Sequence, residues 1–155
     1  MLRILIVCTG NTCRSPMAEA LLKDKIRKAG LSDRILVLSA GIAAGSEVAS
    51  GHACQVMRNR GLNLDEHISR QLSKEFVQAA DLILTMTESH KKLVTALQPE
   101  AAAKTFTLAG FAGSAGDVLD PFGGSEALYE NCARQIVTLL DKSWDKIIKL
   151  AGDKA

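Results

Sequence analysis

The stretch "ILIVCTGNTCRSPMAEALL" (residues 4–22) indicates how the chain begins to fold. Four consecutive aliphatic residues end at Cys8, and a polar segment then leads to Arg14, Ser15 and Pro16. An unbroken aliphatic run is typical of a strand that is buried on both faces of a parallel sheet. Pro16 suits the first turn of a helix, and a serine such as Ser15 favours the N-cap position. The stretch therefore predicts a strand, a tight loop and a helix.

The rest of the chain repeats this alternation of aliphatic runs and helical patterns. Such alternation predicts a parallel sheet that is covered by helices on both faces. We expect one α/β domain over residues 1–155, a three-layer sandwich around a central four-stranded parallel sheet, with an anion-binding loop after the first strand. The expected strands are 2–7, 34–39, 81–86 and 104–108, and the expected helices are 16–30, 49–60, 88–97 and one from about 128, with a glycine-rich loop at 109–124.

Composition narrows the class of protein. The 155 residues carry 19 basic and 17 acidic side chains, and a net charge of +2 argues against nucleic acid as a main partner. No apolar run approaches the roughly 20 residues of a membrane span, so we expect no membrane partner. The four cysteines form no CxxC pair and the three histidines lie far apart, which argues for reduced thiols and against a metal site. We therefore expect a cytoplasmic monomer without a cofactor.

The loop after the first strand has the features of an anion site. The first turn of a helix presents backbone N–H groups without internal partners, together with the positive end of the helix dipole. Gly10 allows a ligand to approach the backbone, and Asn11 tolerates a left-handed conformation. Cys8 would stand at the mouth of this loop, where helix N-termini and cations lower the pKa of a thiol. A lone cysteine here is more often an ordinary buried one, but Arg14 supplies the planar fork that binds phosphate oxygens.

The segment "VCTGNTCRSP" (residues 7–16) resembles the V-C-x-G-N-x-C-R-S-P loop of the low-molecular-weight protein tyrosine phosphatases. The resemblance extends to "SAG" (39–41), "DLILTM" (81–86) and "LDPF" (119–122). It implies that Cys8 is the nucleophile, that Arg14 grips the phosphoryl oxygens and that Asp120 is the general acid. It also implies that Asn11 and Ser15 hold the loop, and that no cofactor is needed. The implied phosphate-binding residues are Thr9, Gly10, Asn11, Thr12, Cys13, Arg14 and Ser15.

The general acid has two candidates in one loop. A nucleophilic mechanism needs a carboxyl group that protonates the leaving group and later accepts a proton from water. The segment "GDVLDPFGGS" (116–125) offers Asp117 and Asp120, and local chemistry alone does not separate them. The match of Asp-Pro to the family pattern favours Asp120.

The residues around the loop bear on the substrate. Tyrosine phosphatases of this family tend to have an aliphatic residue at the position of Thr12 and paired aromatic residues after the acid. This chain has "DPFGG" instead, so that Phe122 is followed by Gly123. Thr12 and "DPFGGS" resemble the protein-arginine-phosphatase branch, and a polar guanidine suits a pocket with one aromatic wall. We expect Thr12 and Phe122 to set the selectivity, with phosphoarginine in proteins as the substrate and phosphotyrosine as the alternative.

Two other functions use a similar loop. Arsenate reduction needs shuttling cysteines near the third strand, and residues 81–95 contain none. A non-catalytic, redox-sensing anion-binding module is the second alternative, because Cys8 and Cys13 lie on one curled loop and a disulfide between them would consume the nucleophile. We expect that disulfide as regulation of an enzyme. The three histidines are expected to be surface or capping residues.

Overall fold

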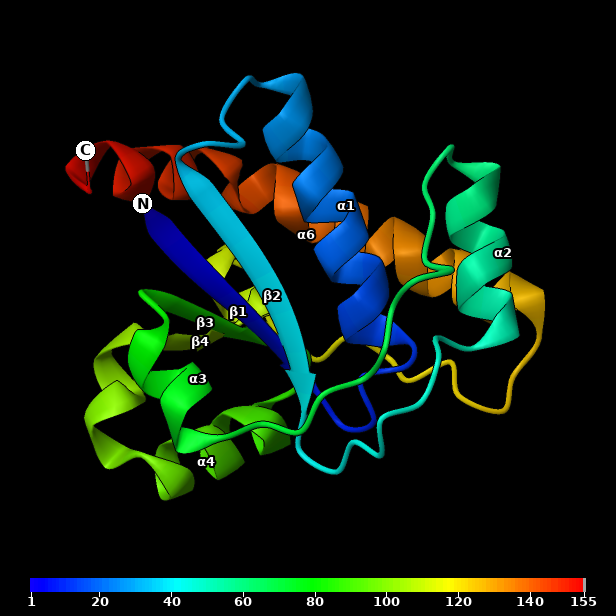
Figure 1. Ribbon diagram of the computed structural model, residues 1–155, viewed down its shortest axis with the longest axis horizontal. Helices are drawn as coiled ribbons and strands as arrows, with labels where there is room; N and C mark the ends of the chain where they lie inside the picture. Colours follow the sequence, from blue (N-terminus) through cyan, green and yellow to red (C-terminus); the bar gives the residue numbers. More distant parts are fainter. Residues whose placement is uncertain (155) are drawn as a thin grey trace.

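The computed structural model describes residues 1–154 as a four-stranded parallel sheet with helices on both faces (Figure 1). The single α/β domain that the sequence predicts is confirmed; residue 155, the end of the predicted domain, lies outside the described residues. In chain order the elements are β1 (Leu2–Cys8), α1 (Arg14–Lys28), β2 (Ile35–Gly41), α2 (Gly51–Asn59), α3 (Lys74–Ala79), β3 (Leu82–Thr85), α4 (Glu88–Leu97), η1 (Pro99–Lys104), β4 (Thr105–Thr107), α5 (Leu108–Phe111) and α6 (Glu126–Asp153).

The sheet has the strand order β2-β1-β3-β4. β1 is therefore an inner strand, and its residue Ile4 pairs with Val37 of β2 and with Leu82 of β3. The chain leaves β1 for β2 on one side and later returns to β3 on the other, so the order of the strands reverses at β1. In open parallel sheets ligands bind beyond the carboxyl ends of the strands at such a reversal. Cys8 is the last residue of β1.

Alternate residues of β1 face two separate cores. Ile4, Ile6 and Cys8 belong to the larger core, which packs against α1, α2 and α6. Leu5 and Val7 belong to the smaller core on the other face, where α3 and α4 lie. Because both faces are buried, every residue of β1 from Ile4 to Cys8 is removed from water, which explains the unbroken aliphatic run.

Three local predictions need correction. The first helix begins at Arg14, so that Cys13 and not Ser15 occupies the N-cap position. A short helix, α3, precedes β3, and the predicted glycine-rich loop 109–124 begins inside another helical turn, α5. Both helices are short, with six and four residues, and a segment of that length shows no periodic apolar stripe that a sequence could reveal.

Candidate active site

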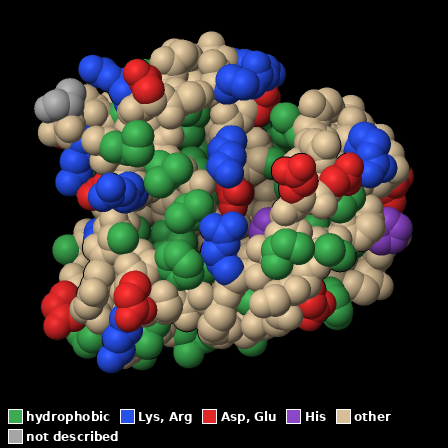
Figure 2. All heavy atoms as spheres, in the orientation of Figure 1, with side chains coloured by type: hydrophobic (Ala, Val, Ile, Leu, Met, Phe, Trp, Pro, Cys, Tyr) green, Lys and Arg blue, Asp and Glu red, His purple; other side chains and the backbone are tan. Residues whose placement is uncertain are grey.

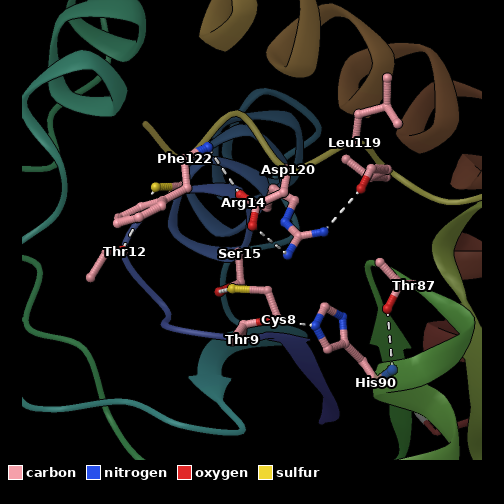
Figure 3. Close-up of polar contacts among 12 residues, drawn as sticks. Cys8, Thr9, Thr12, Arg14, Ser15, Thr87, His90, Leu119, Asp120 and Phe122 are labelled. Atoms are coloured by element: carbon pink, nitrogen blue, oxygen red, sulfur yellow. Dashed lines mark hydrogen bonds and ion pairs between the residues drawn. The ribbon is translucent and has the colours of Figure 1, made fainter. Parts of the chain in front are cut away.

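Residues 9–13 form the β1–α1 loop, which curls around the side chain of Cys8 (Figure 3). Asn11 has a φ of 57°, the left-handed conformation that asparagine tolerates. This turn of the backbone allows the loop to double back from the end of β1 into the first turn of α1. The conformation that the sequence predicts for Asn11 is thus confirmed.

A chain of hydrogen bonds holds the Ser15 hydroxyl oxygen beside Cys8. The backbone N–H of Arg70 donates to Asn11 Oδ1 (3.0 Å), so the amide nitrogen of Asn11 must face the other way. That nitrogen donates to Ser15 Oγ (2.7 Å) and to Ser39 Oγ (2.9 Å), and Ser39 in turn donates to Glu19 Oε1 (2.6 Å). Ser15 Oγ lies 2.8 Å from Cys8 Sγ, so its hydroxyl proton is available to a thiolate at Cys8.

Gly41 explains why the segment "SAG", which forms the end of β2, carries a glycine. A Cβ atom at Gly41 would lie 2.5 Å from the carbonyl oxygen of Thr9 and 3.0 Å from the nitrogen of Asn11. The backbones of β2 and of the β1–α1 loop therefore touch, and only glycine permits this approach. Beyond this contact, the N–H groups of Ile42 and Ala43 donate to the carbonyls of Cys8 and Thr9 (both 2.9 Å).

Arg14 joins the β1–α1 loop to the acid loop, defined as residues 116–125. Its Nη1 donates to the carbonyl oxygen of Val118 (3.0 Å), and its Nη2 lies 3.5 Å from Asp120 Oδ2. The guanidinium group is buried, whereas the Asp120 side chain is about half exposed. Figure 3 shows Arg14 between Asp120 and Ser15, so one cation links the thiol region to the carboxylate.

The structure separates the two candidate acids. Asp120 lines the same cavity as Cys8, and its Oδ1 accepts a hydrogen bond from the N–H of Phe122 (3.1 Å). Asp117 does not line that cavity; its Oδ1 accepts a hydrogen bond from the N–H of Glu88 (2.9 Å) at the first turn of α4. Asp117 thus anchors the acid loop, and Asp120 is the carboxylate that shares the cavity with the thiol.

The cavity at the end of β1 has a volume of about 260 Å³. Its floor is the β1–α1 loop, and Phe122, whose side chain is exposed, stands at its rim. The size suits a phosphoryl group together with the end of a side chain. It is lined by Cys8, Thr9, Gly10, Thr12, Cys13, Arg14, Glu47, Asp120 and Phe122.

Opposing influences act on the Cys8 thiol. Burial is the largest influence and leaves the pKa of Cys8 above its ordinary value, although the hydrogen bond with the Ser15 hydroxyl, the backbone N–H groups of Ser15 and Asn11 and the charge of Arg14 act to lower it. The positive end of the α1 dipole lies at the same place and adds to the lowering influences. Because these influences oppose one another, a thiolate at neutral pH stays a prediction. The contacts with Ser15, Asn11 and Arg14 are the ones that would stabilise it.

Comparison with known proteins decides the family. The model of the family "Low molecular weight phosphotyrosine protein phosphatase" matches residues 3–151. The chain belongs to this family. The resemblance that the sequence shows is therefore confirmed, and the β1–α1 loop, which carries the motif, is termed the phosphatase loop.

Two relatives and one solved structure from the phosphatase family are similar to most of this chain. A protein-arginine-phosphatase of Geobacillus stearothermophilus is 46% identical over 148 residues, which are 94% of this chain and 95% of that protein. A protein-arginine-phosphatase of Bacillus subtilis is 42% identical, over 88% of this chain and 91% of that protein. A solved structure of the YwlE arginine phosphatase, a Cys-to-Ser mutant with a phosphorylated active-site serine, has a TM-score of 0.90 and 39% identity and covers 96% of this chain and 97% of its own.

The histidines depart from the sequence prediction. His90, which we expected at the surface or at a cap, is buried, and its Nε2 lies 2.8 Å from Thr9 Oγ1 of the phosphatase loop. Burial, followed by the charge of Arg14, lowers the pKa of His90 to about 4, so the ring is neutral at physiological pH. His67 also touches the loop, since its Nε2 lies 2.7 Å from the carbonyl oxygen of Asn11. Both histidines support the loop from segments that follow it by more than 50 positions.

The remaining cysteines differ in their surroundings. Cys13 Sγ lies 3.3 Å from the Tyr129 hydroxyl of α6, so Tyr129, whose role the sequence did not indicate, covers the sulfur of the predicted redox partner. Cys132 is buried in the core, and burial raises its pKa to about 12, so its thiol is protonated at neutral pH. Cys54 on α2 is partly buried. All four cysteines are free thiols in the structure.

Figure 2 shows basic and acidic side chains interspersed over the face of the molecule that it draws. Among residues 1–154 no helix is long and apolar enough to cross a membrane. Within the same residues, no group of three or more histidine, cysteine or acidic side chains is placed to hold a metal ion.

We expect Ser15→Ala to shift the reactivity of Cys8 toward higher pH. The lost hydrogen bond stabilises the charged form of the sulfur, so the pKa of Cys8 rises and the thiolate fraction at a given pH falls. Hydrogen bonds to charged groups contribute about 1.5–3 kcal/mol, which corresponds to a roughly ten- to hundredfold slower alkylation at neutral pH. The measurement is the rate of Cys8 alkylation by iodoacetamide against pH, with the Cys8→Ala protein as the blank for the other thiols. An unchanged profile would show that Ser15 does not stabilise the thiolate.

Proposed function

We propose that the protein is a cysteine-dependent protein phosphatase that hydrolyses phosphoarginine in proteins. The observation that carries the proposal is the cavity in which Thr12, Asp120 and a single aromatic ring, Phe122, surround the Cys8 sulfur. Polar walls suit a guanidine, whose N–H groups need acceptors, better than they suit an apolar phenol ring. The names of the relatives from Geobacillus stearothermophilus and Bacillus subtilis support the same substrate.

In the first step, Cys8 Sγ attacks the phosphorus and the bond from phosphorus to the guanidino nitrogen breaks. Asp120 donates its proton to that nitrogen, so the arginine side chain leaves as an intact guanidine and a thiophosphoryl-cysteine remains. The guanidinium group of Arg14, buried beside the sulfur, would bind two of the phosphoryl oxygens. The N–H groups of the phosphatase loop are the remaining donors for the phosphoryl oxygens.

In the second step, water attacks the phosphorus of this intermediate. The Asp120 carboxylate accepts a proton from the water, the bond between sulfur and phosphorus breaks, and phosphate leaves. The proton taken up in this step restores the acid for the next cycle. The phosphorylated serine in the Cys-to-Ser mutant of the YwlE arginine phosphatase supports a covalent intermediate at this position.

The alternative substrate is phosphotyrosine. The exposed Phe122 ring at the rim favours it, because an aromatic ring there can stack on a phenol. Arsenate reduction is disfavoured by the surroundings of the other thiols, since Cys132 is buried and protonated. The redox pair of Cys8 and Cys13, a monomeric state, a cytoplasmic location and the absence of a nucleic-acid partner stay predictions.

The substrate is tested by two peptides of one sequence that carry either phosphoarginine or phosphotyrosine. We expect the wild-type protein to have the higher kcat/KM for phosphoarginine and Thr12→Ile to lower that preference by roughly tenfold or more, because an isoleucine leaves the polar groups of the substrate unpaired. Thr95→Ile is the matched control, because Thr95 of α4 is partly buried like Thr12 but does not line the cavity. Wild-type activity confined to phosphotyrosine would overturn the proposed substrate, and an unchanged ratio in Thr12→Ile would remove Thr12 as the selecting residue.

A further inference from the structure

Glu47 is an exposed residue at the active-site cavity that takes no part in the proposed proton transfer. It follows β2 and lines the same cavity as Cys8 and Asp120. Its backbone is held by two hydrogen bonds to Ser69, because Glu47 N–H donates to Ser69 Oγ and Ser69 N–H donates to the Glu47 carbonyl (both 2.7 Å). Ser69 itself is buried. The carboxylate therefore extends from an anchored position of the backbone.

The exposed side chain of Glu47 lies over Gly45. A Cβ atom built on Gly45 would lie 3.1 Å from Glu47 Oε1, so the carboxylate folds back across Gly45. Because Gly45 has no side chain, this position is open to the carboxylate. Among the described residues, no lysine, arginine or histidine lies within ion-pair distance of Glu47.

An unpaired carboxylate beside a phosphoryl site has an electrostatic consequence. It repels a phosphate dianion and thus weakens the binding of substrates that carry nothing but negative charge. The same carboxylate favours a substrate whose phosphoryl group is attached to a donor-rich group. A charge at Glu47 would therefore discriminate between classes of phosphorylated side chain.

The carboxylate of Asp120 alone does not supply enough hydrogen-bond acceptors for a donor-rich substrate. Its Oδ1 accepts from the N–H of Phe122 and its Oδ2 lies beside Arg14. In the proposed reaction its proton goes to the bridging nitrogen, whereas a phosphorylated guanidine presents further N–H groups on its other nitrogens. A second acceptor in the cavity is required if those donors are not to be left unpaired.

We propose that Glu47 is a specificity-determining residue, whose carboxylate accepts hydrogen bonds from the nitrogens of the phosphoarginine side chain that do not carry the phosphoryl group. This inference rests on the proposed function and adds to it a second acidic wall of the cavity. Glu47 contributes to the choice of substrate and not to the transfer of the proton.

The test compares Glu47→Gln with Glu100→Gln, which removes the same charge from the exposed helix η1 away from the cavity. Each protein is assayed with the phosphoarginine and phosphotyrosine peptides and with inorganic phosphate as a competitive inhibitor. We expect Glu47→Gln to lower kcat/KM for phosphoarginine by roughly tenfold, mainly through KM, because a charged acceptor becomes a neutral one. Activity on phosphotyrosine should stay or rise, and phosphate should inhibit more strongly. Glu100→Gln should match the wild type.

The possible failures are distinguishable. If the wild-type protein prefers phosphoarginine and Glu47→Gln behaves like Glu100→Gln, the role of Glu47 is overturned and the proposed function stands. If Glu47→Gln lowers activity on both peptides equally, Glu47 maintains the shape of the cavity and the inference also fails. If the wild-type protein does not act on phosphoarginine, the proposed function fails, and the inference fails with it.

Discussion

Replacement of Cys8 by alanine is expected to abolish turnover, with kcat/KM falling by at least about 10⁴-fold, as it does when a covalent nucleophile is removed. Among the described residues, Cys8 is the only thiol that both lines the cavity and contacts the Ser15 hydroxyl. The remaining phosphatase loop should still bind an anion. The measurement is steady-state hydrolysis of the phosphoarginine peptide, together with binding of inorganic phosphate by calorimetry.

Cys54→Ala is the matched control for this prediction. Cys54 is a thiol on α2 that does not line the cavity, so its removal should leave kcat/KM unchanged. Comparison of the thermal unfolding of both variants with that of the wild type separates loss of chemistry from loss of fold. Activity that survives in a folded Cys8→Ala protein is incompatible with covalent catalysis by Cys8.

Asp120→Asn is expected to lower kcat by roughly 10²–10⁴-fold, the usual contribution of a positioned acid or base. The amide keeps the size of the side chain but neither donates a proton to the leaving group nor accepts one from water. Asp117→Asn is the control three positions away. Because Asp117 acts through a hydrogen bond to the N–H of Glu88 and lies outside the cavity, we expect a much smaller loss of activity in that variant.

The choice of leaving group sharpens the test of Asp120. p-Nitrophenolate leaves without protonation, so Asp120→Asn should still be phosphorylated by p-nitrophenyl phosphate while the hydrolysis of the intermediate stays slow. The pre-steady-state release of nitrophenol should then show a burst. Equal losses in Asp117→Asn and Asp120→Asn on both substrates would argue that the acid loop acts only as a scaffold.

The sequence predicts the central part of the site because its information there is local. Cys8, Asn11 and Arg14 lie within seven positions, and the left-handed turn at Asn11 follows from the residue type. The alternation of buried strands and helices predicts the parallel sheet. It thereby predicts that the loop lies at the carboxyl ends of the strands. The start of the helix is a detail that the sequence does not predict correctly. Ser15 is expected at the N-cap, but the helix begins at Arg14, and the Ser15 hydroxyl lies against the sulfur and not at the end of the helix.

The supporting contacts of the site are long-range and have no local signal. His90 contacts Thr9 from 81 positions away, and Tyr129 contacts Cys13 from 116 positions away. Neither contact follows from hydrophobic periodicity, which reports which face of an element is buried and not what it touches. Glu47 is similar, because a glutamate in a polar loop has no pattern that places it beside the nucleophile.

The central claim is that the sulfur of Cys8 receives the phosphoryl group, and the most direct test is to trap it there. Asp120→Asn is mixed rapidly with p-nitrophenyl phosphate, quenched during the burst, digested and mapped by mass spectrometry. The account predicts a burst of nitrophenol equal to the enzyme present and one phosphoryl group on the peptide that contains Cys8. Release of nitrophenol in a burst with Cys8 unmodified, or with the phosphoryl group on another residue, would contradict it.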